Sequence, residues 1–464
     1  MNLIDRSATE LARAIASGET SSEAVVCAHL ARIDAMNPRL NAVVGRFDEE
    51  ALADARHADA ELAHGSRRGP LHGVPVTLKE SLSMAGKVTS CGSTTLQANV
   101  TASDATAVAR IKRAGAIPIG RTNVPDMGMD AQTHNLVWGI TRNPWNLRYS
   151  PGGSSGGEGA AIASRMSPLG LGSDVAGSIR IPAAFCGILG LKPTQHRVSI
   201  AGHVPLVLPD YLQVGPLARS VDDLEVALAA IAGPDDLQSM VPPVPLGASA
   251  ARPALPFRVG ILESNGGIQV TRAVRAGVAR AAEATAMLGY EVERAEFAEP
   301  EAAALSLARI FAIELSGLRA QVVAQPAAYH PYLHDLMQTL PPPSLDELDQ
   351  AFALREVLRR RMMACFQRYD VLIAPQLGVP GVPIGTTTEI DVDGIRVPFV
   401  STIAYSVLPN ATGNPSLVLP TGVDGGLPIG VQLIGRMWDE ATLFSLARPL
   451  LDALGGVRLP PDGF

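Results

Sequence analysis

Three short segments of the chain contain residues whose types and spacing suit catalysis or anion binding. The first, SPGGSSGGEGA at residues 150–160, is too rich in glycine for a strand or a helix and leads into a predicted helix. Exposed N–H groups before a helix suit an anion, although the GK[ST] ending of a P-loop is absent. The GGSSG sequence at 152–156 also matches the G-x-S-x-G nucleophile elbow of α/β-hydrolases. A purely structural glycine loop is the third interpretation.

The second segment, GSDVAGSIRIP at residues 172–182, follows a short apolar run and precedes a proline at which a helix can begin. A serine at such a strand-to-helix turn, here Ser178, is placed like a nucleophile. The backbone N–H groups of Val175, Ala176, Gly177 and Ser178 could converge on an oxyanion. A plain turn is the structural alternative.

The third segment is GPLHGVPVTLKE at residues 69–80, in which Lys79 ends an apolar strand predicted at 74–78. A lysine in that place is either a surface residue whose ammonium reaches water or a buried functional amine. The nearby His72 favours a supporting or surface role. The sequence context of this segment alone leaves both interpretations of Lys79 open.

The elements predicted around these segments alternate between short strands and helices. Strands are predicted at 74–78, 117–120, 169–172, 189–192, 257–262, 290–297, 371–374, 416–419 and 429–434. Helices are predicted throughout residues 1–60, and at 107–114, 157–166, 272–288, 300–324, 345–369 and 439–454. The Pro- and Ala-rich stretch at 233–256 is predicted to be a surface excursion. This alternation of strands and helices predicts an α/β fold in which a large mixed β-sheet is covered by helices on both faces. We expect a single domain.

The composition excludes several classes of protein. Of the 464 residues 47% are apolar, which excludes a largely disordered chain, and a net charge of −7 argues against nucleic acid as a partner. Cys27, Cys91, Cys186 and Cys365 are far apart and form no CxxC pair, so we expect free thiols, without a disulfide framework or a metal. We expect no signal peptide and no membrane span, and therefore a cytoplasmic protein.

Taken together, the three segments resemble the amidase signature family. Its pattern also fits at GRTNVPDMGMD (120–130), TRNPW (141–145), PLGLGSDVAGSIRIPAAFCGILGLKPT (168–194) and GLPIGVQLIGRMWDEATL (426–443). A long match in a fixed order is more specific than any one motif. The resemblance implies one amidase-signature domain over residues 1–464. Its parts are an N-terminal helical segment (1–60), a catalytic core (61–235), variable helices and loops on the substrate side (236–400), and C-terminal strands with a helix (401–464).

The resemblance also implies a Ser–Ser–Lys triad. Ser178 would be the nucleophile, Ser154 the bridging serine that follows a cis peptide bond, and Lys79 the base. Lowering the pKa of a lysine from ~10.4 to ~7 requires roughly 4.6 kcal/mol of desolvation and local field. Asp174 and Arg180 are expected to pair with each other as scaffold. Where the family usually has two glycines before the nucleophile, the first is Ala176, whose Cβ disfavours positive φ. The oxyanion loop must then use ordinary backbone angles at this residue or be slightly displaced.

The substrate is predicted from residues near the motifs. Met127, Gly128 and Met129 are apolar, and Ile403 occupies the position at which the family's transamidases carry an acid for the amino group of glutamine. These residues predict an amidase that hydrolyses a small neutral, apolar or aryl amide, and also carbamates or esters, through an acyl-enzyme and without a cofactor. The expected partner is a small-molecule amide, with neither nucleic acid nor membrane; a homodimer is compatible with the sequence.

Three alternatives to that function stay open at this point. The first is the A subunit of a glutamine-dependent tRNA amidotransferase complex. The second is a non-catalytic relative, which the intact Lys79, Ser154 and Ser178 argue against. The third is a Ser–Asp–His hydrolase, for which only His330 and His334 occur late enough in the chain, in a Pro- and Tyr-rich connection.

Overall fold

The computed structural model describes residues 2–247, 257–262, 267–295, 300–386 and 388–461. Within these residues, the largest sheet has eleven strands in the order β1-β3-β2-β6-β8-β7-β14-β15-β11-β9-β10. Its strands are β1 (Val43–Arg46), β2 (Pro75–Lys79), β3 (Ile117–Thr122), β6 (Leu169–Asp174), β7 (Leu189–Lys192), β8 (Gln213–Ala218), β9 (Arg258–Ile261), β10 (Glu291–Arg294), β11 (Val371–Pro375), β14 (Ser416–Asp424) and β15 (Leu427–Gly435). Two hairpins lie outside it: β4 (His134–Asn135) with β5 (Gly139–Ile140), and β12 (Glu389–Val392) with β13 (Ile395–Pro398).

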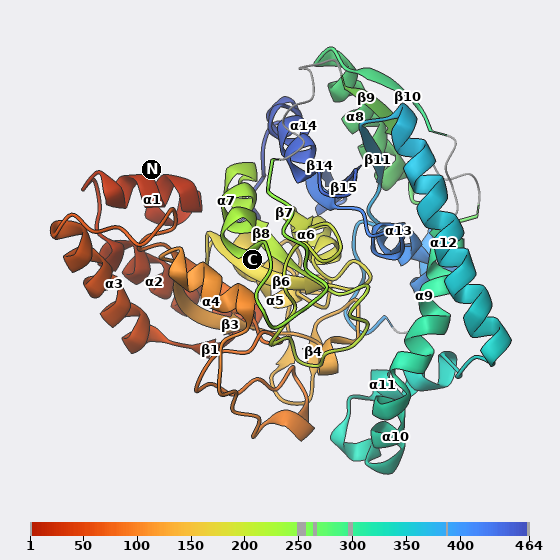
Figure 1. The fold of residues 1–464 in the computed structure, drawn as a ribbon, viewed down its shortest axis with the longest axis horizontal. Coiled ribbons are helices and arrows are strands. Elements are labelled where there is room, and N and C mark those ends of the chain that lie inside the picture. The colour runs from red at the N-terminus through yellow and green to blue at the C-terminus, as the bar shows by residue number, and fades with distance from the viewer. Residues whose placement is uncertain (1, 248–256, 263–266, 296–299, 387, 462–464) are drawn as a thin grey trace.

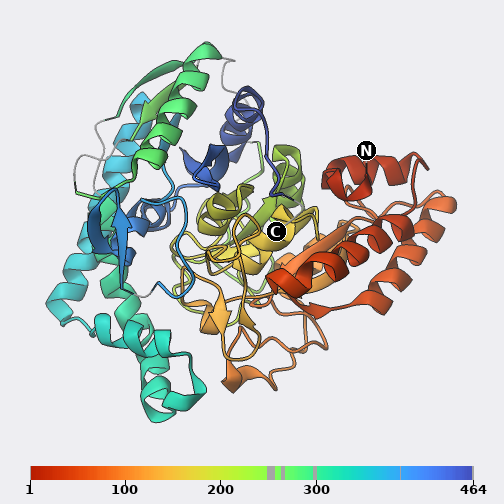
Figure 2. The same cartoon turned by 180° about the vertical axis from the view of Figure 1, so that it is seen from behind.

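Helices flank this sheet. They are α1 (Ala8–Ala16), α2 (Ser22–Leu40), α3 (Asp48–Ala63), α4 (Thr106–Arg113), α5 (Gly156–Ala163), α6 (Arg180–Cys186), α7 (Val221–Ile231), α8 (Arg272–Met287), α9 (Pro300–Glu314), α10 (Ser316–Ala324), α11 (Pro331–Thr339), α12 (Leu345–Arg368), α13 (Ala404–Thr412) and α14 (Glu440–Ala453). The N-terminal helices α1–α3 gather at one end of the molecule and α9–α12 at the other (Figure 1). The reverse view shows the same separation (Figure 2).

The strands that carry the predicted site lie side by side in the sheet. β2 pairs with β6 in parallel, with Leu78 opposite Leu171, and every residue of both strands is buried. Strands buried on both faces are continuous apolar or small-residue runs, which explains the VTL and LGLG sequences. Because parallel strands end at the same edge of a sheet, Lys79 at the end of β2 lies close to the end of β6.

Small residues let α5 and the glycine–serine loop pack directly against the backbone. A Cβ at Gly157 would lie 2.4 Å from the backbone nitrogen of Asn123, and one at Gly159 would lie 2.9 Å from the Cβ of Pro182 on α6. Neither distance is sterically acceptable, so the glycines of this region are required by close packing and not only by flexibility. The packing fixes the loop before α5 between β3 and α6.

The predicted α/β fold, with one mixed sheet, flanking helices and a single domain, is confirmed. The strand at 189–192 has the bounds of β7, and the helices at 272–288 and 345–369 differ from α8 and α12 by one residue at an end. The division of the domain into four parts stays a prediction. No helix among the described residues has both the length and the apolar character needed to cross a membrane.

Some elements were predicted wrongly. Residues 1–60 are not all helical, because β1 forms the edge of the sheet there, and β8 and α7 were missed. β10 ends at Arg294, and Phe297, the last residue of the predicted strand, lies outside the described residues. So do residues 248–256 of the predicted surface excursion. β8 reads QVGPLA, and its proline and glycine obscure the pattern of a central strand.

Candidate active site

Lys79 is the last residue of β2 and its side chain is buried, with 1% of its surface exposed. Its Nζ lies 2.7 Å from the Oγ of Ser154 and 2.9 Å from the Oγ of Ser173. Burial lowers the pKa of Lys79 to about 8, although the negative charge of Asp174 acts in the opposite direction. Of the two interpretations of this lysine, the structure therefore shows the buried amine, of which about a tenth is neutral at pH 7.

Ser154 lies in the loop that leads into α5, and it too is buried. The peptide bond between Gly153 and Ser154 is cis, as the family resemblance implies. A Cβ at Gly153 would lie 2.5 Å from the carbonyl oxygens of both Asp130 and Gln132. Only glycine fits between these two carbonyl groups, so the backbone of residues 130–132 holds the loop and sets the position of the Ser154 hydroxyl.

Ser178 lies in the turn between β6 and α6. Its carbonyl oxygen accepts a hydrogen bond of 3.0 Å from the N–H of Ser155, which joins this turn to the loop that carries Ser154. Ser178 is partly exposed, whereas Lys79 and Ser154 are buried. The arrangement leaves one hydroxyl accessible to a molecule from solvent and shields the amine behind it.

The turn before Ser178 is organised by the carboxylate of Asp174. Its Oδ1 accepts a hydrogen bond from the N–H of Gly177 at 2.8 Å, and its Oδ2 accepts one from the N–H of Ile179 at 3.1 Å. Because the Gly177 N–H is directed at Asp174, Val175, Ala176 and Ser178 are left as the candidate oxyanion donors among the four predicted. The positive φ of +112° falls on Gly177, and Ala176 keeps ordinary backbone angles.

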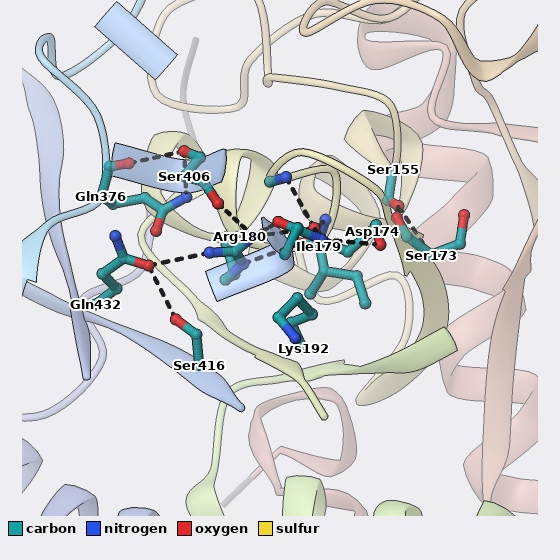
Figure 3. A network of polar contacts seen from close by, with 12 residues as sticks. Ser155, Ser173, Asp174, Ile179, Arg180, Lys192, Gln376, Ser406, Ser416 and Gln432 are labelled. Carbon is teal, nitrogen blue, oxygen red and sulfur yellow. Dashed lines mark hydrogen bonds and ion pairs between the residues drawn. The ribbon is translucent and has the colours of Figure 1, made fainter. Parts of the chain in front are cut away.

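Arg180 is fully buried and joins this turn to the far strands of the sheet (Figure 3). Its Nε and Nη2 each lie 3.0 Å from one carboxylate oxygen of Asp174, and its Nη1 donates to the Oε1 of Gln432 on β15. Burial alone would raise the pKa of Asp174, but the charge and hydrogen bonds of Arg180 hold that pKa well below its usual range. The predicted pairing of Asp174 with Arg180 is present, and it anchors the turn that carries Ser178.

The residues predicted to form the substrate pocket do not all lie together. A Cβ at Gly128 would be 3.9 Å from the Oγ of Ser154, which places this glycine beside the serine. Met127 and Met129 contact an apolar cluster formed with residues of α10 and α11, such as Leu318 and Leu333. Ile403 packs in a different cluster, which includes Phe399. The structure therefore places Gly128 beside Ser154, and the contribution of Met127, Met129 and Ile403 to the substrate pocket stays a prediction.

The late histidines make contacts elsewhere. The ring centroid of His330 lies 4.1 Å from that of His134, and the Nε2 of His334 lies 2.9 Å from the carbonyl oxygen of Pro326. These contacts give no support to a Ser–Asp–His arrangement with Ser178. Within the described ranges, no group of three or more His, Cys, Asp and Glu side chains is arranged to hold a metal ion.

Two residues that touch the site were not singled out in the sequence. Ser173, the last residue but one of β6, contacts Lys79, and His203 contacts Ser173. Ser173 could have been identified from the GSD sequence, because every second residue at the end of a strand points to the same side as the turn that follows it. His203 had no such signal, since it lies 30 residues further along the chain, in a connection between β7 and β8.

The model of the family described as Amidase matches residues 24–444 of the chain. The chain belongs to the amidase signature family. It is thus an amidase-family hydrolase that cleaves C–N bonds. It is 36% identical to the A subunit of the glutamyl-tRNA(Gln) amidotransferase of Moorella thermoacetica, over 96% of both chains.

Solved structures of amidase signature proteins share this fold. One, described as an unexpected vestigial protein complex that reveals the evolutionary origins of an s-triazine catabolic enzyme, superposes with a TM-score of 0.89. It is 34% identical, over 98% of this chain and all of that one. A bacterial aryl acylamidase is 26% identical, with a TM-score of 0.87 over 97% of this chain and 96% of its own.

The comparisons correct two predictions. The prediction of an amidase for small neutral, apolar or aryl amides, carbamates or esters is wrong, because curated relatives that match nearly the full chain at 32–36% identity are named as amidotransferase subunits. The prediction of a small-molecule partner without nucleic acid is wrong for the same reason, since that name includes a tRNA. The apolar character of Met127, Met129 and Ile403 does not identify the substrate, because these side chains also pack against apolar clusters of the fold.

Proposed function

We propose that this chain is the amide-cleaving A subunit of a glutamine-dependent tRNA amidotransferase. The observation that carries this proposal is the 36% identity to one such protein over 96% of both chains. The site suits the task, since releasing ammonia from glutamine requires cleavage of one unactivated C–N bond. A complex with partner subunits and tRNA, in the cytoplasm, follows from this assignment.

The reaction begins with Lys79 in its neutral form. As the Ser178 hydroxyl attacks the amide carbon, its proton passes to Ser154, and the proton of Ser154 passes to the Lys79 amine. The C–O bond forms, the oxyanion accepts hydrogen bonds from the backbone N–H groups of Val175, Ala176 and Ser178, and the C–N bond then breaks. The proton returns by the same route to the leaving nitrogen, which departs as ammonia. Water then hydrolyses the acyl-enzyme by the same steps and releases glutamate.

Three observations support these roles. The Nζ of Lys79 lies 2.7 Å from the Ser154 hydroxyl, which is within reach of direct proton transfer. Burial lowers the pKa of Lys79 to about 8, so a neutral base is available near physiological pH. Ser178 is the partly exposed member of the set, as a nucleophile that meets an external substrate must be.

The test is a glutaminase assay on the chain alone and on the chain assembled with its partner subunits and tRNA. We expect ammonia release from glutamine in the assembled complex, and its loss in Ser178→Ala. A matched control is Ser445→Ala, on the exposed face of α14, which should keep the wild-type rate. Failure of the complex to release ammonia from glutamine, while a fluorophosphonate still labels Ser178, would show a working amidase site with a different substrate.

A further inference from the structure

His203 is a histidine next to the site that the proposed reaction does not use. Its Nε2 lies 2.9 Å from the Oγ of Ser173 and 3.1 Å from the Oγ of Ser81. Its Nδ1 lies 2.8 Å from the carbonyl oxygen of Pro205. Ser173 is in turn bonded to Lys79, so the histidine reaches the proposed base through one hydroxyl.

These contacts determine which ring nitrogen carries the proton. A carbonyl oxygen can only accept, so the Nδ1 of His203 must be the N–H donor to Pro205. Burial and the nearby Lys79 lower the pKa of His203 to about 3, which keeps the ring neutral. In a neutral ring with the proton on Nδ1, Nε2 is a hydrogen-bond acceptor.

The direction of the next hydrogen bond follows. Ser173 has one hydroxyl proton, and Nε2 of His203 has one lone pair and no proton to give. Both Ser173 at 2.9 Å and Ser81 at 3.1 Å face that lone pair, and the shorter distance favours Ser173 as its donor. The oxygen of Ser173 is then left as an acceptor toward Lys79, whose Nζ is also 2.9 Å away. The hydroxyl cannot donate to Lys79 at the same time.

A neutral lysine amine has two N–H groups and one lone pair. Two acceptors from Ser173 face the Nζ of Lys79, the Oγ at 2.9 Å and the carbonyl oxygen at 3.4 Å. With both N–H groups directed at Ser173, the lone pair faces the remaining neighbour, the Oγ of Ser154 at 2.7 Å. A general base needs that orientation, since the lone pair must meet the proton to be removed.

We propose that His203 is a positioning residue that, through Ser173, turns the lone pair of Lys79 toward Ser154. The inference rests on the Ser178–Ser154–Lys79 roles of the proposed function. Without the histidine, the Ser173 hydroxyl is free to donate to Lys79 and to occupy the lone pair. The neutral amine would then be stabilised, but its lone pair would not face Ser154.

The experiment measures how fast a fluorophosphonate labels Ser178, from pH 6 to pH 10, on the full chain. This probe needs the activated serine but no particular amide, so the result is independent of the substrate. His203→Phe keeps an aromatic ring and removes the acceptor. We expect its plateau labelling rate to fall about 10- to 100-fold, as when other groups that orient a reactive ligand are removed. His203→Gln, which offers an oxygen near the Nε2 position, should recover part of the rate.

The pH profile separates orientation from a loosened structure. The charged or titratable groups that act on Lys79 are Cys91, Asp174 and Glu158, and all three are unchanged in the variant. In His203→Phe the Ser173 hydroxyl donates to the lone pair of Lys79 and so stabilises the neutral amine. The rising limb of the labelling rate of this variant should therefore move to lower pH, while its plateau falls. Water entering a loosened site would move the limb to higher pH, and that result would overturn the proposal.

Two further variants complete the test. Ser173→Ala should reduce labelling, and adding His203→Phe to it should change little more, because the histidine acts through that hydroxyl. Ser81→Ala, which removes the other hydroxyl near Nε2, should keep the wild-type rate. Additive losses in the double variant, or a wild-type rate in His203→Phe, would overturn the role of His203 while leaving the proposed function intact. If the wild-type Ser178 is not labelled but the complex hydrolyses glutamine, the triad roles and this inference both fail.

Discussion

Two regions of the molecule differ in how far their side chains are buried. Around β2, β6 and the loop before α5, the polar groups of Lys79, Ser154 and Asp174 are buried and hydrogen-bonded. On α12, which lies at one end of the molecule, large apolar side chains are exposed, and 85% of the surface of Leu345 and 70% of that of Met363 are accessible to solvent. The comparison indicates that the chemistry is built into a buried, hydrogen-bonded edge of the sheet, and we expect exposed positions of α12 to tolerate substitution without disturbing it.

Removing a reacting group should have the largest effect on the rate of hydrolysis. Ser178→Ala removes the attacking oxygen, and Lys79→Ala removes the base, so we expect each to lower the rate of amide hydrolysis by at least about 10⁴-fold. This loss is measured as the steady-state rate of ammonia release. Met363→Ala, on exposed α12, is the matched control and should keep its rate. Comparable losses in all three variants would contradict a division between a catalytic edge and a variable end.

The buried ion pair offers the next largest effect. Arg180→Met leaves the Asp174 carboxylate buried without its partner, which should lower the free energy of unfolding by about 3–5 kcal/mol. Denaturant titration followed by circular dichroism measures the loss. The control is Arg360→Met on α12, whose partner Glu356 is 51% exposed, and it should change stability by less than about 1 kcal/mol. Equal changes in the two variants would mean that the turn before Ser178 is not held by this pair.

The pH dependence of hydrolysis tests the state of the base. Lys79 acts as a base only when neutral, and burial lowers its pKa from 10.5 to about 8. The rate should therefore rise about tenfold per pH unit below that value and level off above it. A plateau reached only near the ordinary lysine pKa of 10.5 would show that the amine is solvated. The residual activity of Lys79→Ala should lack this rising limb.

The smallest expected effect concerns recognition of glutamine. Ile403 is the N-cap residue of α13, a position that accepts aspartate or asparagine well. Ile403 is predicted to occupy the position at which transamidases of the family carry an acid. Ile403→Asp should therefore lower the KM for glutamine about tenfold, the value of one hydrogen bond to a charged group. Ile403→Asn is the control, because it caps the helix equally without a charge. Equal KM values in the two variants would assign any improvement to helix capping.

The sequence predicts the catalytic edge far better than its surroundings. Lys79 and Ser154 belong to segments whose glycines and apolar runs admit few conformations, so their juxtaposition follows from a motif match. The hydrogen bond from Gly177 to Asp174 could not be predicted, because it depends on the backbone angles of a single turn. His203 was missed because its contact depends on the path of the connection between β7 and β8, which no local pattern encodes. The role of Ile403 stays a prediction, because the residue type alone does not reveal which apolar cluster it contacts.

Gly153 fits closely between two carbonyl oxygens, each of which would lie 2.5 Å from a Cβ at this position. This close fit has a practical consequence for directed evolution. A saturation library at this codon should return glycine alone among active clones, since every other residue displaces the neighbouring serine. Codons for exposed positions of α12 should tolerate most substitutions. An engineer who wishes to alter the substrate of this chain should leave the glycine–serine loop untouched.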